Sequence, residues 1–206
     1  MIKKIQIILT VVASAIMLSA CGIIEKNNKI APGEIWLDTD GNPINAHGGG
    51  VLFHKGTYYW YGEIKEGETY TPECNKSWGG TRVEVTGISC YSSKDLYNWT
   101  YEGNVLPAVK DDPNHDLHTS KVLERPKVVY NAKTDKFVLW AHVESMDYSK
   151  ACSGVAVSDS PTGPFTYIRS MRPNAGFWPT NLTPNDTIGE SILKRDYIGG
   201  QMARDM

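Results

Sequence analysis

The sequence contains no cluster of basic residues, few cysteines and only one long apolar run. With a net charge of −2 and a pI of about 6.2, it lacks the positive surface with which proteins bind nucleic acids, and nucleic acid is excluded as a partner. None of the 4 cysteines forms a Cys-x-x-Cys pair, so the common zinc spacings are absent. Hardly any segment has apolar residues at helical spacing, which argues against a helical protein.

The apolar run lies at the N-terminus and is typical of an export signal. Two lysines precede an apolar stretch over residues 5–17, which is short for a membrane span, and the segment "LSAC" then ends at Cys21. Small residues before a cysteine at this place resemble the lipobox of bacterial lipoproteins, in which Cys21 becomes the lipidated first residue. We therefore predict a signal peptide over residues 1–20 and a tether over residues 21–32. The resemblance implies a lipid anchor in a membrane of the bacterial cell envelope, periplasmic or surface-exposed. An ordinary signal peptide with an incidental cysteine is the alternative.

Three further cysteines, Cys74, Cys90 and Cys152, leave at least one thiol unpaired if any disulfide forms. Their pairing is not determined by the sequence, and a structural role, buried or half-paired, is the better interpretation.

The composition is that of a β-rich protein with many turns. Glycine occurs 19 times and proline 11 times, and aromatic residues make up 10% of the chain. Apolar residues alternate with polar ones, which predicts four hairpins. They turn at Lys55-Gly56, at residues 93–95, at residues 132–136 and within "SDSPTGP", and the strand after the second turn begins near Trp99.

The four hairpins form two copies of one unit. In each copy an aromatic-rich hairpin precedes a second hairpin, and Trp99 in the first copy corresponds to Phe165 in the second. Four antiparallel strands per unit fit a blade of a β-propeller, although a β-sandwich of about eight strands has the same pattern. Residues 110–127 and 172–189 are predicted loops. We therefore expect about two blades and the start of a third, with no closing element.

The two units resemble the five-bladed propellers of glycoside hydrolase family 43. The resemblance covers about residues 33–206 and rests on "AHGGGVLFHKGTYYWYGE", "CYSSKDLYNW", "ERPKVVYNAKTDKFVLWAH" and the terminal "ARDM". It is strongest to the branch of the exo-β-1,3-galactanases. The resemblance implies an all-β propeller that hydrolyses plant-type polysaccharide, most specifically by releasing galactose from β-1,3-galactan with inversion.

Inversion needs one carboxylic acid that protonates the leaving oxygen and one carboxylate that activates water. The usual base of the family opens the first blade, but the sequence has no carboxylate between Asp40 and Glu63, a departure that the galactanase branch shares. In that branch the glutamate of "ERPK", here Glu124, contacts the galactose. Asp205 matches the aspartate that modulates the acid's pKa. We predict Glu124 and Asp205 as the catalytic carboxylates. The general acid would lie beyond residue 206, so we expect the chain alone to be inactive.

Sugar contacts are predicted at the same sites. Tyr58 and Trp60 fall on one face of their strand, and Tyr59, Tyr61 and Glu63 on the other. Aromatic rings cover apolar sugar faces, and carboxylates accept hydrogen bonds from sugar hydroxyls. Substrate binding is therefore assigned to a set of four residues. The set is Glu63, Tyr61, His47 and Arg125.

Several alternatives stay open. The aromatic residues would instead pack between blades, Glu63 would pair with a lysine or arginine, and Glu124 would form a plain salt bridge with Arg125. "HDLH" at residues 115–118 is interpreted as a solvated loop and not as a metal pair. Family 43 proteins sometimes hold a cation in the central channel, but no residue here specifies one, so neither a cofactor nor a metal is predicted. An α-L-arabinofuranosidase or β-xylosidase on the same fold, or a non-catalytic glycan-binding propeller, are alternative functions.

Overall fold

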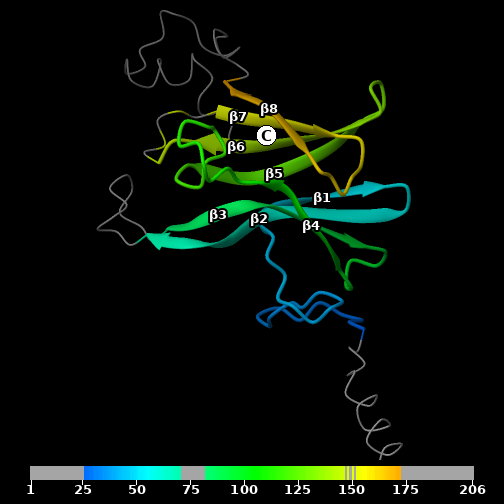
Figure 1. Cartoon of the computed structure of the whole chain (residues 1–206). Coiled ribbons are helices and arrows are strands. Elements are labelled where there is room, and N and C mark those ends of the chain that lie inside the picture. The colour runs from blue at the N-terminus through cyan, green and yellow to red at the C-terminus, as the bar shows by residue number, and fades with distance from the viewer. Residues whose placement is uncertain (1–25, 71–81, 147, 149, 151, 173–206) are drawn as a thin grey trace, which may run out of the picture.

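The chain forms two four-stranded antiparallel sheets, shown in Figure 1. The computed structural model describes residues 26–70, 82–146, 148, 150 and 152–172. The first sheet has the order β1-β2-β3-β4 and the second the order β5-β6-β7-β8. The strands are β1 (His47–His54), β2 (Thr57–Tyr70), β3 (Arg82–Ser93), β4 (Thr100–Pro107), β5 (Val122–Asn131), β6 (Lys136–Glu144), β7 (Cys152–Ser158) and β8 (Thr166–Met171).

This topology confirms the predicted four hairpins and two four-stranded units. Consecutive strands complete one sheet before the next sheet begins, as in the blades of a propeller. The first strands of the two sheets, β1 and β5, are in contact, and Figure 1 shows the second sheet lying over the first. The described part of the chain contains no helix, and therefore none that is long and apolar enough to cross a membrane.

The turn between β1 and β2 follows directly from its sequence. Lys55 and Gly56 both have positive φ angles, 46° and 76°, as the type I′ two-residue hairpin turn requires. This backbone twist matches that of the flanking strands, so the turn fixes the β1–β2 register. The turn predicted at Lys55-Gly56 is confirmed, and β4 begins at Thr100, directly after Trp99.

The prediction of a loop through Lys127 is wrong, because β5 already begins at Val122. The strand contains Pro126, which has no backbone N–H to donate to a neighbouring strand. A β-bulge accommodates it: the register with β6 shifts between Glu124 and Lys127, and Arg125 has a positive φ of 54°. The proline that signalled a loop thus marks an irregular strand.

Two apolar clusters cover the two faces of β2. Between the sheets, Tyr61, Ile88, Leu139 and Val143 are almost fully buried, and Tyr59 packs against this cluster. On the other face, Trp99 and Tyr91 are buried, and Tyr58 and Trp60 pack against them. The predicted division of the aromatic residues between two faces is confirmed, and both faces serve packing.

The segment before β1 covers the outer face of the first sheet. Trp36 packs with its ring centroid 5.6 Å from that of Trp60 and donates its indole N–H to the carbonyl of Tyr97 at 3.1 Å. Asn27, inside the predicted tether, exchanges two hydrogen bonds of 2.8 Å with Asn98. The N-terminal segment, blue in Figure 1, therefore contacts the first sheet from Asn27 onwards.

The cysteines that are described are buried and unpaired. Cys90 lies in the core and Cys152 at the start of β7, and both are free thiols. Burial raises the pKa of both thiols, so they stay protonated and inert. This agrees with the predicted structural role. Cys21, Cys74 and Asp205 lie outside the described residues.

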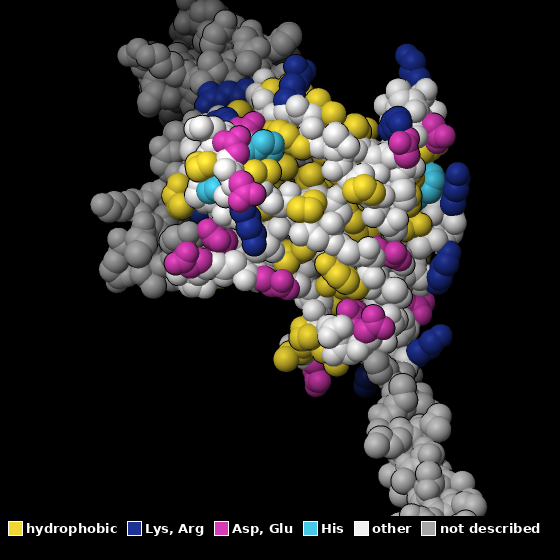
Figure 2. All heavy atoms as spheres, in the orientation of Figure 1, with side chains coloured by type: hydrophobic (Ala, Val, Ile, Leu, Met, Phe, Trp, Pro, Cys, Tyr) yellow, Lys and Arg dark blue, Asp and Glu magenta, His cyan; other side chains and the backbone are white. Residues whose placement is uncertain are grey.

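On the face shown in Figure 2, the charged side chains lie mainly towards the ends of the sheets. Figure 2, in the orientation of Figure 1, shows acidic, basic and histidine side chains at the two ends of the sheets and mainly hydrophobic or uncoloured atoms over their middle. One of these ends contains the starts of β1 and β5, where the predicted site residues lie.

Candidate functional site

The three glycines of β1 lie tightly against the neighbouring strand β2 and against β5 of the second sheet. Gly48 has a φ of +56°, and a side chain there would place its Cβ 2.4 Å from Oε1 of Glu63. A Cβ at Gly49 would lie 1.9 Å from the carbonyl oxygen of Tyr61, and one at Gly50 would lie 2.7 Å from Cδ of Lys127. The glycines therefore leave room for the buried carboxylate of β2 and for the side chain of Lys127 on β5.

Glu63 joins the two sheets. Its side chain is almost completely buried, and Oε1 accepts a hydrogen bond of 2.9 Å from the backbone N–H of Arg125. The bulge in β5 presents this N–H to the first sheet. The other oxygen, Oε2, lies 3.3 Å from Nζ of Lys65. The alternative in which Glu63 pairs with a cation is thus realised through Lys65, while Arg125 contributes its backbone.

Glu124 is the more accessible carboxylate of the site. Its side chain retains 25% of its exposure, so it can still meet a ligand. Oε2 lies 3.3 Å from Nδ1 of His142, and Oε1 accepts a hydrogen bond of 2.9 Å from the hydroxyl of Tyr148. Burial by itself would raise the pKa of Glu124, but the hydrogen bonds from His142 and Tyr148 outweigh it and hold the pKa below its ordinary value. Glu124 is therefore a carboxylate with one partner on each oxygen.

His142 and Glu144, on β6, complete this end of the second sheet and were not predicted from the sequence. His142 is directly opposite Glu124 in the β5–β6 register, and Glu144 is opposite Val122. Glu144 is fully buried, and its Oε2 lies 3.5 Å from Nε2 of His142. The sequence does contain a signal for them. His142 and Glu144 are two positions apart, so they share one face of a strand that is otherwise apolar there, and a pair of ionisable residues in such a place indicates a polar site.

The carboxylate of Glu144 also anchors the segment that follows β6. Oε1 accepts hydrogen bonds from the backbone N–H groups of Ser145, at 2.9 Å, and Lys150, at 2.5 Å. These bonds hold the backbone of Ser145 and of Lys150 at the end of the strand. Tyr148, which lies between them in the sequence, donates its hydroxyl to Glu124.

Basic residues surround the two carboxylates. Lys127 extends across β1, and Nζ donates to the carbonyls of Gly48, at 3.3 Å, and Gly49, at 3.2 Å. Burial lowers the pKa of Lys127, although Glu63 opposes the shift. His47, exposed, is paired in register with Glu63, and Arg125, also exposed, follows Glu124. Four of the predicted site residues, His47, Glu63, Glu124 and Arg125, are thus brought together.

Tyr61 is the predicted sugar contact that the structure does not bring to this site. The residue is fully buried between the sheets, where its ring meets Phe165 edge-on. Its hydroxyl donates a hydrogen bond of 2.6 Å to the carbonyl of Pro161, and burial raises its pKa. In this arrangement Tyr61 contributes to the contact between the sheets.

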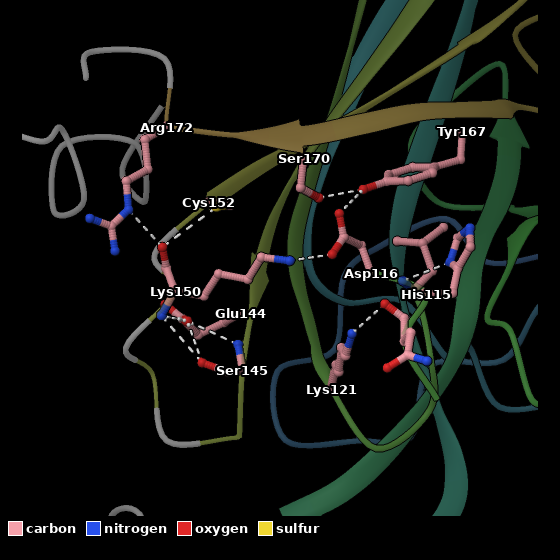
Figure 3. Close-up of polar contacts among 12 residues, drawn as sticks. His115, Asp116, Lys121, Glu144, Ser145, Lys150, Cys152, Tyr167, Ser170 and Arg172 are labelled. Atoms are coloured by element: carbon pink, nitrogen blue, oxygen red, sulfur yellow. Dashed lines mark hydrogen bonds and ion pairs between the residues drawn. The ribbon is translucent and has the colours of Figure 1, made fainter. Parts of the chain in front are cut away.

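The segment "HDLH" is held against the second sheet, as Figure 3 shows. Asp116 forms an ion pair with Lys150 and accepts a hydrogen bond of 2.8 Å from the hydroxyl of Tyr167. Leu117 is buried in the core, so this loop is docked and not simply solvated. Nowhere in the described residues do three or more histidine, cysteine or carboxylate side chains form a group that could hold a metal ion.

Comparison with known proteins gives matches among solved structures. No family model and no curated protein matches the chain. A family 43 β-1,3-galactosidase, solved with galactodeoxynojirimycin, is 47% identical over 80% of this chain and 46% of its own, with a TM-score of 0.65. An exo-β-1,3-galactanase from Phanerochaete chrysosporium, solved with β-1,3-galactotriose, is 38% identical over 70% of this chain and 30% of its own, with a TM-score of 0.59.

A third structure, an exo-β-1,3-galactanase from Clostridium thermocellum, is 44% identical over 70% of this chain and 28% of its own, with a TM-score of 0.57. The chain thus spans less than half the length of each of these relatives. Within that span the likeness covers both sheets and confirms the resemblance predicted from the sequence.

Proposed function

We infer the function from the family: the chain resembles glycoside hydrolase family 43, in its β-1,3-galactanase branch, at 38–47% identity. We propose that the protein to which it belongs releases galactose from β-1,3-galactan by exo-hydrolysis with inversion. The observation that supports this most strongly is the hydrogen bond from the backbone N–H of Arg125, the residue after Glu124, to the buried carboxylate of Glu63, in a chain so similar to β-1,3-galactosidases and exo-β-1,3-galactanases.

In this proposal Glu124 is the residue that binds galactose. It is ionised, and its partners hold both oxygens while a quarter of the side chain stays exposed. Carboxylates in such settings accept strong hydrogen bonds from hydroxyl groups. Glu63 helps to position Glu124, because it accepts a hydrogen bond from the backbone N–H of the next residue, Arg125. His47 and Arg125, both exposed, are proposed to contact the sugar at the rim.

The proton transfers require groups other than these. Inversion needs an acid and a base on opposite faces of the sugar. Asp205 is proposed to modulate the acid's pKa, as the family resemblance implies, and the acid and base are proposed to be supplied by other parts of the whole protein. We do not assign Glu63 to this chemistry, because its carboxylate is buried and engaged by Arg125 and Lys65.

Two other functions are compatible with the same fold. An α-L-arabinofuranosidase or β-xylosidase would act on a pentose, and a glycan-binding propeller would need only the binding residues. The identities of 38–47% to galactosidases and galactanases favour the galactan enzyme.

We also propose that the protein is attached to the bacterial cell envelope through Cys21. The support is the sequence alone: the apolar run and "LSAC" at residues 18–21. Replacing Cys21 with serine is expected to move the protein from the membrane fraction to the soluble fraction. An unchanged distribution between the fractions would contradict the anchor.

The test of the activity uses the protein expressed from its complete reading frame. We expect it to release galactose from β-1,3-galactan and no pentose from arabinan or xylan. The Glu124→Gln variant is expected to lose about 100-fold in kcat/KM, because it removes a charge-assisted hydrogen bond to the substrate. Glu34→Gln, at an exposed residue of the N-terminal segment, is the matched control. Pentose release would favour the second function, and galactan binding without hydrolysis the third.

A further inference from the structure

The second sheet contains a histidine placed between two carboxylates. His142 is 4% exposed, and its two ring nitrogens lie 3.3 Å from Oε2 of Glu124 and 3.5 Å from Oε2 of Glu144. Glu124 faces the site, and Glu144 is fully buried behind it. The ring therefore connects an accessible carboxylate to one that no ligand can reach.

We propose that His142 is a positioning residue, which donates a hydrogen bond from Nδ1 to Glu124 and thereby fixes this carboxylate for galactose. Glu144 has the supporting role of keeping the histidine in the form that can donate. The proposal rests on the function proposed above, because it deepens the role of Glu124 in sugar binding.

The direction of the first hydrogen bond follows from the charge of Glu124. A carboxylate has only acceptor sites, and a ring nitrogen without a proton is also an acceptor. Two acceptors at 3.3 Å would repel each other, so Nδ1 carries the proton. A neutral ring with its proton on Nδ1 has a bare Nε2.

The contact with Glu144 determines whether a proton lies at Nε2 of His142. This nitrogen is completely buried and has no hydrogen-bond partner within ordinary geometry among the described residues. The nearest acceptor is Oε2 of Glu144, 3.5 Å away. A bare nitrogen facing a carboxylate would be repelled, so one proton lies between Nε2 and Oε2, whichever atom it is bonded to. With Nδ1 protonated towards Glu124, the ring is cationic if this proton is on Nε2 and neutral if it is on Glu144, and Nδ1 can donate in both cases.

The same carboxylate controls the other partner of Glu124. Through Oε1, Glu144 holds the backbone of Ser145 and Lys150, and the segment between them carries Tyr148. The hydroxyl of Tyr148 donates to Oε1 of Glu124. Glu144 therefore positions Glu124 by two routes, one through the histidine ring and one through the backbone. Both oxygens of the sugar-binding carboxylate are oriented by a buried group that does not contact the sugar.

Two substitutions at His142 separate this role from packing. The side-chain amide of asparagine superposes on Nδ1, and that of glutamine reaches to the position of Nε2. In the whole protein, His142→Asn is expected to keep its dissociation constant for galactose within about threefold of wild type. His142→Gln is expected to weaken it about tenfold or more, as the loss of a hydrogen bond to a charged group predicts. Titration calorimetry with galactose measures both.

A second readout does not depend on the sugar. The pKa of Glu124, followed by carbon-13 NMR of the glutamate side chains, is expected to rise in His142→Gln and to stay close to wild type in His142→Asn. The controls are His54→Asn and His54→Gln at the far end of β1, where the ring packs 4.5 Å from that of Tyr130. Neither control is expected to change galactose affinity.

The outcomes are distinguishable. If the wild-type protein binds no galactose, the proposed function fails, and the titration of Glu124 still decides the role of His142. Equal effects of asparagine and glutamine on both readouts would overturn that role, since they would show packing alone. If neither variant folds, nitrogen-15 NMR of the wild-type histidines decides: a proton on Nδ1 of His142 is expected, and a bare Nδ1 overturns the proposal.

Discussion

The close approach of Gly48 to Glu63 leads to a quantitative prediction. In Gly48→Ala the new methyl group would lie 2.4 Å from Oε1 of Glu63, well inside contact distance. It would also occupy a backbone with a φ of +56°, which residues with a side chain avoid. Glu63 has to move, and its hydrogen bond to the N–H of Arg125 is lost.

The two effects are separated by a second glycine. Gly56 also has a positive φ, +76°, but a Cβ there would meet nothing within 4 Å. Gly56→Ala therefore has only the backbone penalty, about 1–2 kcal/mol. Gly48→Ala adds the loss of a charge-assisted hydrogen bond, about 1.5–3 kcal/mol, for a total of about 2.5–5 kcal/mol.

Denaturant unfolding of the two variants measures this difference, and titration calorimetry with galactose measures its consequence at the site. We expect Gly48→Ala to be the less stable by about 1.5–3 kcal/mol and to bind galactose about tenfold more weakly, because the displaced Glu63 releases the backbone next to Glu124. Gly56→Ala is expected to bind as wild type does. Equal stabilities, or equal affinities, would refute the role assigned to Glu63.

Two further predictions concern Tyr61 and Glu124. Tyr61→Phe removes the hydrogen bond to Pro161 and is expected to lower the free energy of unfolding by about 1–2 kcal/mol without changing galactose affinity; weaker binding at unchanged stability would instead place the ring on the sugar. Because the pKa of Glu124 is lowered on folding, its charge stabilises the fold above the unfolded pKa of about 4.3, and this stability is lost as the pH falls towards the folded pKa. Below about pH 4.3, unfolding curves of Glu124→Gln should therefore depend less on pH than those of wild type, and equal dependence would contradict the assigned partners.

The local features of the fold could be predicted because each depends on neighbouring residues. Lys55-Gly56 specifies its turn through two positive φ angles, and the alternation of Tyr58 to Tyr61 assigns each ring to a face. These signals need no knowledge of what lies across the sheet. The correspondence of Trp99 with Phe165 is of the same kind, and both residues are buried just before the last strand of their sheet.

The features that could not be predicted depend on contacts between distant segments. Nothing in the sequence near Tyr61 indicates that the carbonyl of Pro161, one hundred residues later, accepts a hydrogen bond from its hydroxyl. Pro126 signalled a loop, because local reasoning does not reveal a bulge that pairs with β6. His142 and Glu144 were not predicted for a related reason: their importance comes from contacts around Glu124 on the neighbouring strand β5, which the sequence of β6 alone does not reveal.

The hydrogen bonds that link the two sheets, beginning with that of Glu63, limit how early the first sheet can fold during synthesis. On the ribosome the first sheet is complete when residue 107 has emerged, but three of its groups have no partners yet. Glu63 requires the N–H of Arg125, the hydroxyl of Tyr61 requires Pro161, and the carbonyl of Val105 requires the N–H of Phe165, which it accepts at 2.8 Å. At usual synthesis rates these partners arrive several seconds later. A nascent first sheet must keep these groups in water during that interval, so stable burial of its inner face waits for the translation of the second.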